Sequence, residues 1–177
     1  MARAGDVFTL HDGERVTIRT PAEASAGELL EGDAEWAPIE LEPPAHFHPE
    51  QSERFEVREG ELTIEIEGAT HVAGPGDVVE VPRGAVHRMW NSASTTTRAT
   101  WQVRPALRTE DFFEAVHEVR SSGRHGENGM LTPLGAGVVL REFRDEFSMP
   151  MPRALQRPVL ALLASAARLR GYPAVAG

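Results

Sequence analysis

Short runs of alternating apolar and polar residues dominate the first part of the chain. In residues 62–66 every second side chain is apolar, and residues 16–19 alternate in the same way. Further short runs rich in β-branched or aromatic residues cover 78–81, 86–90 and 95–103, each preceded by turn-forming residues. A period of two gives a strand one apolar face, and many short strands separated by turns are typical of an antiparallel sandwich or barrel. We therefore predict a mainly β fold for this part.

After Pro105 the spacing of apolar residues lengthens to that of an amphipathic helix. Thr109 is a candidate N-cap, because acidic residues follow it in the first turn. The polar stretch 121–128, which contains two glycines, predicts a loop. Thr132, followed directly by a proline, then opens a second predicted helix that extends to about Phe147.

Two methionine–proline pairs at 149–152 interrupt the helical pattern before a last amphipathic helix. We expect this helix to end before Gly171, and Pro158 either to kink it or to restart it. The chain is thus predicted to consist of a β-barrel at 1–105 and a helical C-terminal extension at 106–177. The extension would pack on the barrel or on a partner subunit, and the apolar face of its last helix suggests a homodimer.

Composition limits the chemistry that the chain can perform. It contains no cysteine, which excludes disulfides, iron–sulfur clusters and thiolate ligands or nucleophiles. All 18 basic residues are arginines, so no lysine can form a Schiff base. The net charge is −9, and the acidic first part argues against a nucleic-acid partner. No secretory signal is visible, and the apolar stretch 159–169 is too short to span a bilayer, so we expect a cytoplasmic protein without a membrane role.

Two short segments carry most of the candidate chemistry. The first supplies His46, His48 and Glu53, and the second supplies His87 after a proline- and glycine-containing turn. Residues two apart on a strand point to the same face, so His46 and His48 can both point into a barrel. Glu53 lies at an odd offset from His48, so it can join the histidines only if the chain bends after Pro49.

Three imidazoles and one carboxylate form a ligand set for one divalent transition metal: Fe, Ni, Mn, Cu, Co or Zn. They leave positions open on a six-coordinate ion, and without a thiolate the set is unlike a structural zinc site. Glu53 has a second candidate role, as a catalytic general base. Met89 is the best candidate to line a substrate pocket because it shares a strand face with His87, whereas Trp90 and Trp101 are expected in packing layers.

The spacing of these residues resembles the two motifs of the cupin superfamily. The second motif, G-x5-P-x-G-x2-H-x3-N, matches completely over 76–91; the first matches over 46–60 but has Glu40 in place of its leading glycine. The resemblance implies a small jelly-roll β-barrel over about residues 7–103, similar to single-domain bacterial cupins. The residues to which it assigns the metal are His46, His48, Glu53 and His87.

The resemblance implies several reactions, because cupins include dioxygenases, oxalate-degrading enzymes, sugar isomerases and non-catalytic binders or sensors. The four-ligand set is most similar to that of dioxygenase-like members, so we favour a metal-dependent oxidoreductase that acts on a small organic substrate. Two alternatives stay open: a non-catalytic metal or small-ligand sensor, and a redox-neutral isomerase or lyase. The sequence therefore favours an enzyme without deciding the question.

The remaining four histidines lie in polar or turn-like contexts. His71 and His125 lie in turn-like, polar contexts, His11 lies beside Asp12 and Gly13, and His117 falls on the polar side of the first predicted helix. We expect all four at the surface, because isolated histidines in such contexts have no apolar face to join.

Overall fold

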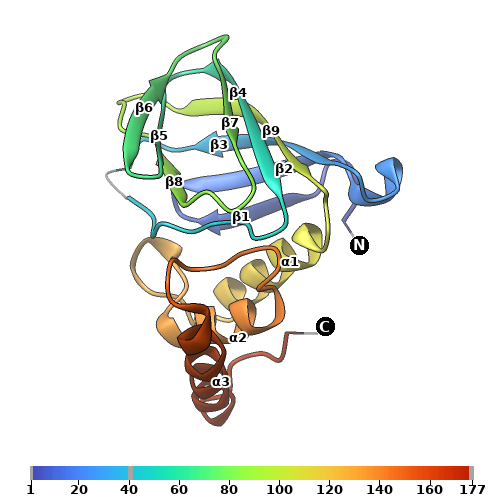
Figure 1. Ribbon diagram of the computed structural model, residues 1–177, viewed down its shortest axis with the longest axis vertical. Coiled ribbons are helices and arrows are strands. Elements are labelled where there is room, and N and C mark those ends of the chain that lie inside the picture. Colours follow the sequence, from blue (N-terminus) through green and yellow to red (C-terminus); the bar gives the residue numbers. More distant parts are fainter. Residues whose placement is uncertain (1, 40–41, 176–177) are drawn as a thin grey trace.

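The computed structural model describes residues 2–39 and 42–175. Glu40, at the first position of the first motif, lies outside the described residues. The β-strands form two antiparallel sheets that enclose a common core (Figure 1). The larger sheet has the strand order β1-β2-β3-β9-β4-β7, and the smaller has the order β6-β5-β8. This arrangement confirms the predicted mainly β, jelly-roll barrel.

The strands of the larger sheet are β1 (Val7–His11), β2 (Glu14–Thr20), β3 (Leu30–Trp36), β4 (Ser52–Glu59), β7 (Val78–Val81) and β9 (Thr97–Arg104). Those of the smaller sheet are β5 (Leu62–Ile66), β6 (Ala69–Ala73) and β8 (His87–Trp90). Buried and less buried side chains alternate along β3, β4 and β8, as in a sheet with one face on the core. Trp36, Phe55 and Leu62 belong to this core and are almost fully buried.

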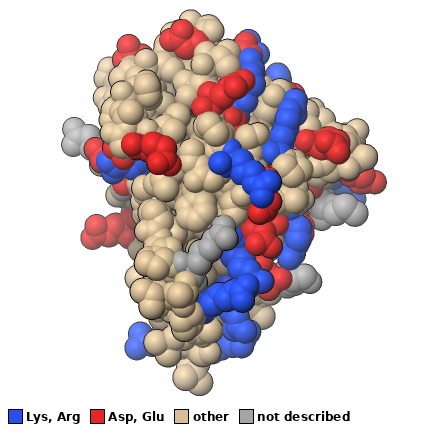
Figure 2. All heavy atoms as spheres, viewed as in Figure 1, with Lys and Arg blue, Asp and Glu red and all other residues tan. Residues whose placement is uncertain are grey.

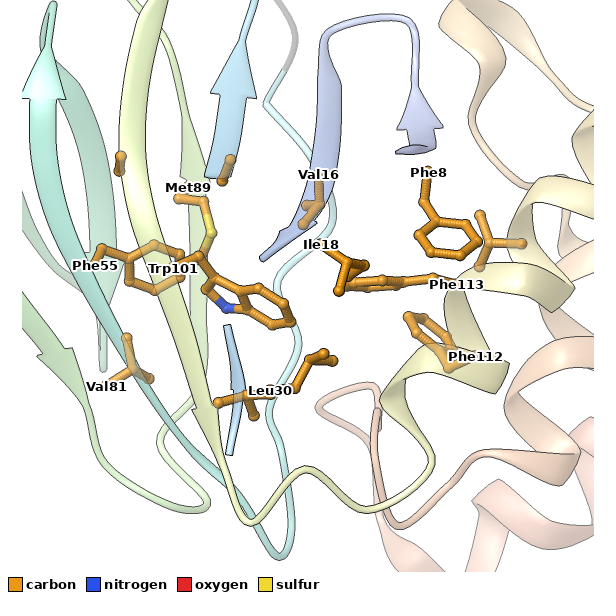
Figure 3. Close-up of a cluster of buried hydrophobic side chains, with 14 of the residues drawn as sticks. Phe8, Val16, Ile18, Leu30, Phe55, Val81, Met89, Trp101, Phe112 and Phe113 are labelled. Atoms are coloured by element: carbon orange, nitrogen blue, oxygen red, sulfur yellow. The ribbon is translucent and has the colours of Figure 1, made fainter. Parts of the chain in front are cut away.

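A helical extension follows the barrel, and its apolar residues join the barrel core. Its described α-helices are α1 (Thr109–Ser121), α2 (Pro133–Glu142) and α3 (Arg153–Leu169), and short 3-10 helices lie at Ala22–Ser25 and Glu127–Gly129. In Figure 1, α1 lies against the barrel and α3 lies farthest from it. Phe113 of α1 contacts Phe8 of β1 and Trp101 of β9, with ring centroids 5.8 and 5.5 Å apart (Figure 3). The core is therefore continuous from barrel to helices, and a domain boundary at residue 105 stays a prediction.

The predicted cap of α1 is wrong. The N-cap position is Arg108, which makes no side-chain capping bond, and Thr109 is already helical. The Thr109 hydroxyl instead donates to the Ala106 carbonyl at 2.8 Å and accepts from Gln51 Nε2 at 2.8 Å. The Thr109 hydroxyl is used in this way because the buried Gln51 amide needs hydrogen-bond partners inside the protein.

The second helix begins as predicted after Thr132, whose hydroxyl accepts the N–H of Gly135 at 3.1 Å. It ends at Glu142 and does not reach Phe147, so the predicted end is wrong. The next side chain, Phe143, is fully buried, and the chain turns after it. This turn returns the chain to the barrel, where Ser148 forms a β-bridge with Phe47 of the first motif, and such tertiary contacts outweigh a helical pattern.

The last helix, α3, runs through Pro158 without restarting there. Gly171 follows the helix with φ of 71°, the left-handed conformation expected just after a helix end. Leu162 and Leu169 of α3 are 71% and 91% exposed, and the charged side chains visible around this end of the molecule are arginines (Figure 2). None of the helices in the described residues is long and apolar enough to cross a lipid bilayer.

Candidate metal centre

His46 and His87 reach the site from paired backbone segments. Each residue donates its N–H to the carbonyl of the other, at 2.9 and 2.8 Å, in an antiparallel bridge. Directly paired residues place their side chains on one face, and the two imidazole centroids are 4.3 Å apart. His48, two residues further on, keeps the same face, and its ring centroid lies 5.2 Å from that of His87.

Glu53 enters the site from β4 because the chain bends after His48, as its odd offset requires. Residues 49–51 belong to no strand, and β4 begins directly after them. Gln51, which is 1% exposed, holds this bend: its Nε2 lies 2.8–3.0 Å from acceptors in the segment 105–109. The bend is thus attached to the start of the helical extension, and this attachment fixes the direction in which Glu53 points.

The ligand atoms of these four residues all lie within 4.8 Å of one another. Glu53 Oε2 is 3.1 Å from His48 Nε2 and 2.9 Å from His87 Nε2. These three atoms and His46 Nδ1 are nevertheless buried, and none forms a hydrogen bond with a described residue. Buried polar atoms are nearly always hydrogen-bonded, so four converging atoms without such a bond fit a shared cation. The donor set could hold one divalent transition metal.

Neighbouring groups orient three of the four candidate ligands. Trp101 Nε1 donates to Glu53 Oε1 at 2.7 Å and leaves Oε2 directed at the histidines. His87 Nδ1 lies 3.0 Å from the carbonyl two residues earlier, and His48 Nδ1 faces the carbonyl of Glu146. A carbonyl can only accept a hydrogen bond, so the geometry assigns the ring proton to Nδ1 and leaves the Nε2 lone pair free for a metal.

The same neighbours shift the protonation equilibria of the site. Burial lowers the pKa of His46 well below its ordinary value, and the nearby His48 and His87 lower it further. Burial also opposes a charge on His48, but the Glu53 carboxylate outweighs burial and the pKa of His48 is raised. For Glu53, burial acts to raise the pKa, yet the interaction with His48 outweighs it and holds the pKa well below its usual range. Glu53 therefore stays ionised at neutral pH, as a metal ligand must be.

One wall of the site comes from the helical extension, which sequence reasoning did not connect with the metal ligands. Phe147 stacks on His46, with ring centroids 4.2 Å apart and planes 11° apart. Phe112 of α1 stacks on Phe147 in turn, at 5.3 Å and 18°. Trp101 was expected only in a packing layer; it is indeed buried, but its N–H also holds Glu53. Aromatic rings from three separate segments thus cover the candidate ligands.

A cavity of about 220 Å³ adjoins the ligands, and most of its lining is apolar. His46, His48 and Glu53 lie in its wall. Met89 also lines it, on the same buried face of β8 as His87, and points into the barrel beside Trp101 (Figure 3). Among the described residues that line this cavity there is no arginine.

The other histidines do not join the site, but one of them lies in the cavity wall. Those found at the surface, as predicted, are His71, His117 and His125. His11 is 7% exposed and lines the cavity, so its predicted surface position is wrong. The turn after His11 is covered by the helical extension: Asp12 pairs with Arg120 of α1 at 2.9 Å, and its N–H donates to the Asn128 carbonyl at 2.8 Å. A long-range contact of this kind leaves no local signal in the sequence.

Comparison with known proteins gives one family match, over residues 32–103, to the family described as the cupin domain. An oxidoreductase of Arthrobotrys oligospora is 45% identical over 51 residues, which are 28% of this chain and 20% of that protein. The match thus spans only a fifth of the length of that curated relative.

Among solved structures, KdgF from a Halomonas species superposes with a TM-score of 0.50 at 17% identity, covering 56% of this chain and 86% of that one. A sugar phosphate isomerase of the cupin superfamily from Silicibacter pomeroyi gives a TM-score of 0.46 at 21% identity, covering 54% and 61%. At these identities the likeness to KdgF concerns the fold alone. The family match, the two-sheet barrel and the two motifs agree with one another, and the chain carries a domain of the cupin superfamily.

Proposed function

We propose that the protein is a metal-dependent oxidoreductase of the dioxygenase type that acts on a small, largely apolar organic substrate. The observation that supports this most strongly is the convergence of four ligand candidates, three of which lie in the wall of an apolar cavity. The similarity of a short segment to a protein named as an oxidoreductase points the same way. Glu53 is proposed as both ligand and catalytic base.

The charge of the cavity lining restricts the substrate. Glu14, Glu53 and Glu146 line the cavity, and the described lining residues include no arginine to oppose them. Away from the metal ligands, a phosphate or carboxylate group would meet no arginine of the described lining, and burial of an unpaired charge is costly. We therefore propose a substrate that is neutral in solution and ionises only at the metal, a class that does not include phosphorylated sugars.

In the proposed site His46, His48, His87 and Glu53 hold one divalent transition metal, of the group Fe, Ni, Mn, Cu, Co and Zn. Such an ion, when bound, supplies positions at which an ionised substrate and dioxygen can be brought together. The ligand set selects among these metals only weakly, because geometry and availability decide which ion is bound.

The residues of the chain contribute binding, exclusion of water and proton transfer. Phe147 and Met149 close the cavity on the side of the helical extension and keep water from the ligands. Glu53 is fixed through Oε1 by Trp101, so its Oε2, when released from the metal, would be placed to accept a proton from a substrate hydroxyl. Its lowered pKa keeps the carboxylate in the basic form at neutral pH.

The test is oxygen consumption by protein reconstituted with each candidate metal, using neutral aromatic and aliphatic alcohols as substrates. We expect oxygen uptake that requires both metal and substrate and that falls at least about a hundredfold in Glu53→Gln. A matched control is Glu50→Gln, which changes an exposed glutamate of the same segment. Turnover without oxygen uptake would instead favour an isomerase or lyase, and metal-dependent binding without turnover would favour a sensor.

A further inference from the structure

Three polar side chains form a row across the first three strands of the larger sheet. In the strand register, His11 of β1 pairs with Glu14 of β2, and Glu14 pairs with Trp36 of β3. Paired residues place their side chains on the same face, and all three line the cavity that adjoins the metal ligands. None of them belongs to the two cupin motifs. We call His11, Glu14 and Trp36 the polar row.

Two nitrogen atoms of the polar row are buried without a hydrogen bond to a described residue, and for Trp36 Nε1 no ion pair takes its place. Trp36 is 2% and His11 7% exposed, yet neither Trp36 Nε1 nor His11 Nε2 forms a hydrogen bond with any residue that the structure describes. His11 Nδ1 accepts the N–H of Gly13 at 3.1 Å, so the proton of the neutral ring lies on Nε2. His11 Nε2 approaches Glu14 Oε2 to 3.1 Å without the geometry of a hydrogen bond. Unpaired buried donors are costly, which indicates that a ligand group completes this part of the cavity.

We propose that the polar row binds a hydroxyl group of the substrate, in a subsite formed by residues other than the metal ligands. A hydroxyl can accept the N–H of Trp36 and donate to the Glu14 carboxylate, whereas an anionic group would be repelled by Glu14. His11 lies against Glu14 and positions it. Phe112 and Phe113 line the same cavity and offer aromatic surface to the apolar body of such a molecule. Aromatic alcohols are therefore the proposed substrate class. Only the description of the bound molecule as a substrate rests on the proposed function.

The backbone that carries the polar row is held from two sides. The turn residue Asp12 is bound to Arg120 and to the Asn128 carbonyl. On the other side the Ile39 side chain packs so closely on Gly13 that a Cβ there would lie 2.4 Å from it. A subsite on such a fixed turn loses little freedom when a ligand binds.

The test compares 2-naphthol with 2-methylnaphthalene, which has a methyl group in place of the hydroxyl. Titration calorimetry on the metal-free full-length protein should show about tenfold tighter binding of 2-naphthol, because only 2-naphthol forms the two hydrogen bonds. Trp36→Phe and Glu14→Gln should each weaken 2-naphthol about tenfold and leave 2-methylnaphthalene unchanged. In nitrogen-15 spectra, the indole N–H signal that disappears in Trp36→Phe should shift with 2-naphthol in the parent protein.

Trp90→Phe is the matched control, because Trp90 is packed under Arg88 and is not among the residues that line the cavity; it should leave both affinities unchanged. Absence of 2-naphthol binding, equal affinities for the two probes, or parallel losses of both probes in folded variants would overturn the proposal. If Trp36→Phe fails to fold, Glu14→Gln carries the test, since Glu14 is partly exposed. Both probes are measured on metal-free protein, so the two proposals can fail separately. Absence of metal-dependent oxygen uptake would contradict the proposed function but would not affect the measured affinities for the two probes.

Discussion

The two carboxylate oxygens of Glu53 have different neighbours, and this difference organises the site. Oε1 accepts the N–H of the buried Trp101 at 2.7 Å, whereas Oε2 lies 2.9 Å from His87 Nε2. A carboxylate that is fixed through one oxygen has little freedom left to lose when the other binds a cation. Trp101 would therefore act on a bound metal through Glu53 without touching it.

The substitution Trp101→Phe tests this role. It keeps an aromatic ring in the core but leaves Glu53 Oε1 without its donor, so metal affinity should fall roughly tenfold to a hundredfold. Competition with a chelator of known affinity measures the change. Trp90→Phe, on the other face of β8, serves as control and should leave the affinity unchanged. An unchanged metal affinity in a folded Trp101→Phe protein would show that the Glu53 carboxylate does not need the hydrogen bond from Trp101 to bind the metal.

The pH dependence of metal binding follows from His48. A metal binds the neutral imidazole, so protons compete with it, and affinity falls as the pH falls through the pKa of His48. Because Glu53 raises this pKa against the effect of burial, the loss should begin at a higher pH than for an unperturbed histidine of about 6.5. Metal release to a chelator, followed across a pH series, measures this. Release that begins only well below the ordinary histidine pKa would contradict the assignment.

At the scale of single residues, the sequence predicted the four ligand candidates because the spacing within each of the two motifs is local, and the structure brings the two motifs together. Trp101 was missed as a partner of Glu53 because it lies diagonally across from it, in a position that depends on the register between β4 and β9. Register is a long-range property and leaves no spacing that can be read along the chain. His11 was misplaced for the same kind of reason, since its cover comes from the helical extension.

Among the elements, the segment between α2 and α3 contributes most to the site beyond the strands. The carbonyl of Glu146 faces His48, Phe147 stacks on His46, and Ser148 bridges to the first motif. The sequence predicted helix as far as Phe147, because a periodic pattern cannot show that a buried Phe143 ends the helix early. The start of α2 was predictable, since Thr132 and the following proline form a local signal.

Pro158 gives a test of α3 as one continuous helix. A proline inside a helix cannot donate the hydrogen bond to the carbonyl four residues earlier, and its side chain here is exposed. Pro158→Ala should therefore raise the free energy of unfolding by about 1–2 kcal/mol, the restored bond outweighing the greater freedom of the unfolded chain. Denaturant titration measures this, with the exposed Arg157→Ala as control. A protein that is no more stable would indicate that the helix restarts at Pro158.

For the whole molecule, the candidate centre lies where barrel and helical extension meet. Strands β4 and β8 and the segment before β4 supply the ligand candidates, whereas α1 and the segment after α2 supply aromatic rings that cover them. The barrel was predictable from alternation and motifs, since these are written locally along each strand. The way in which the helical extension closes the cavity could not be predicted, because the sequence of an amphipathic helix shows which face is apolar but not what that face contacts.

The most direct test of a metal centre in this fold is elemental analysis of protein purified without an affinity-tag metal and then reconstituted. The parent protein should bind one transition metal ion per chain, and His48→Ala/His87→Ala should lose it. The control pair His71→Ala/His125→Ala, which removes two exposed histidines, should retain it. A folded parent that binds no metal after reconstitution, or a His48→Ala/His87→Ala protein that still binds one ion per chain, would contradict the account.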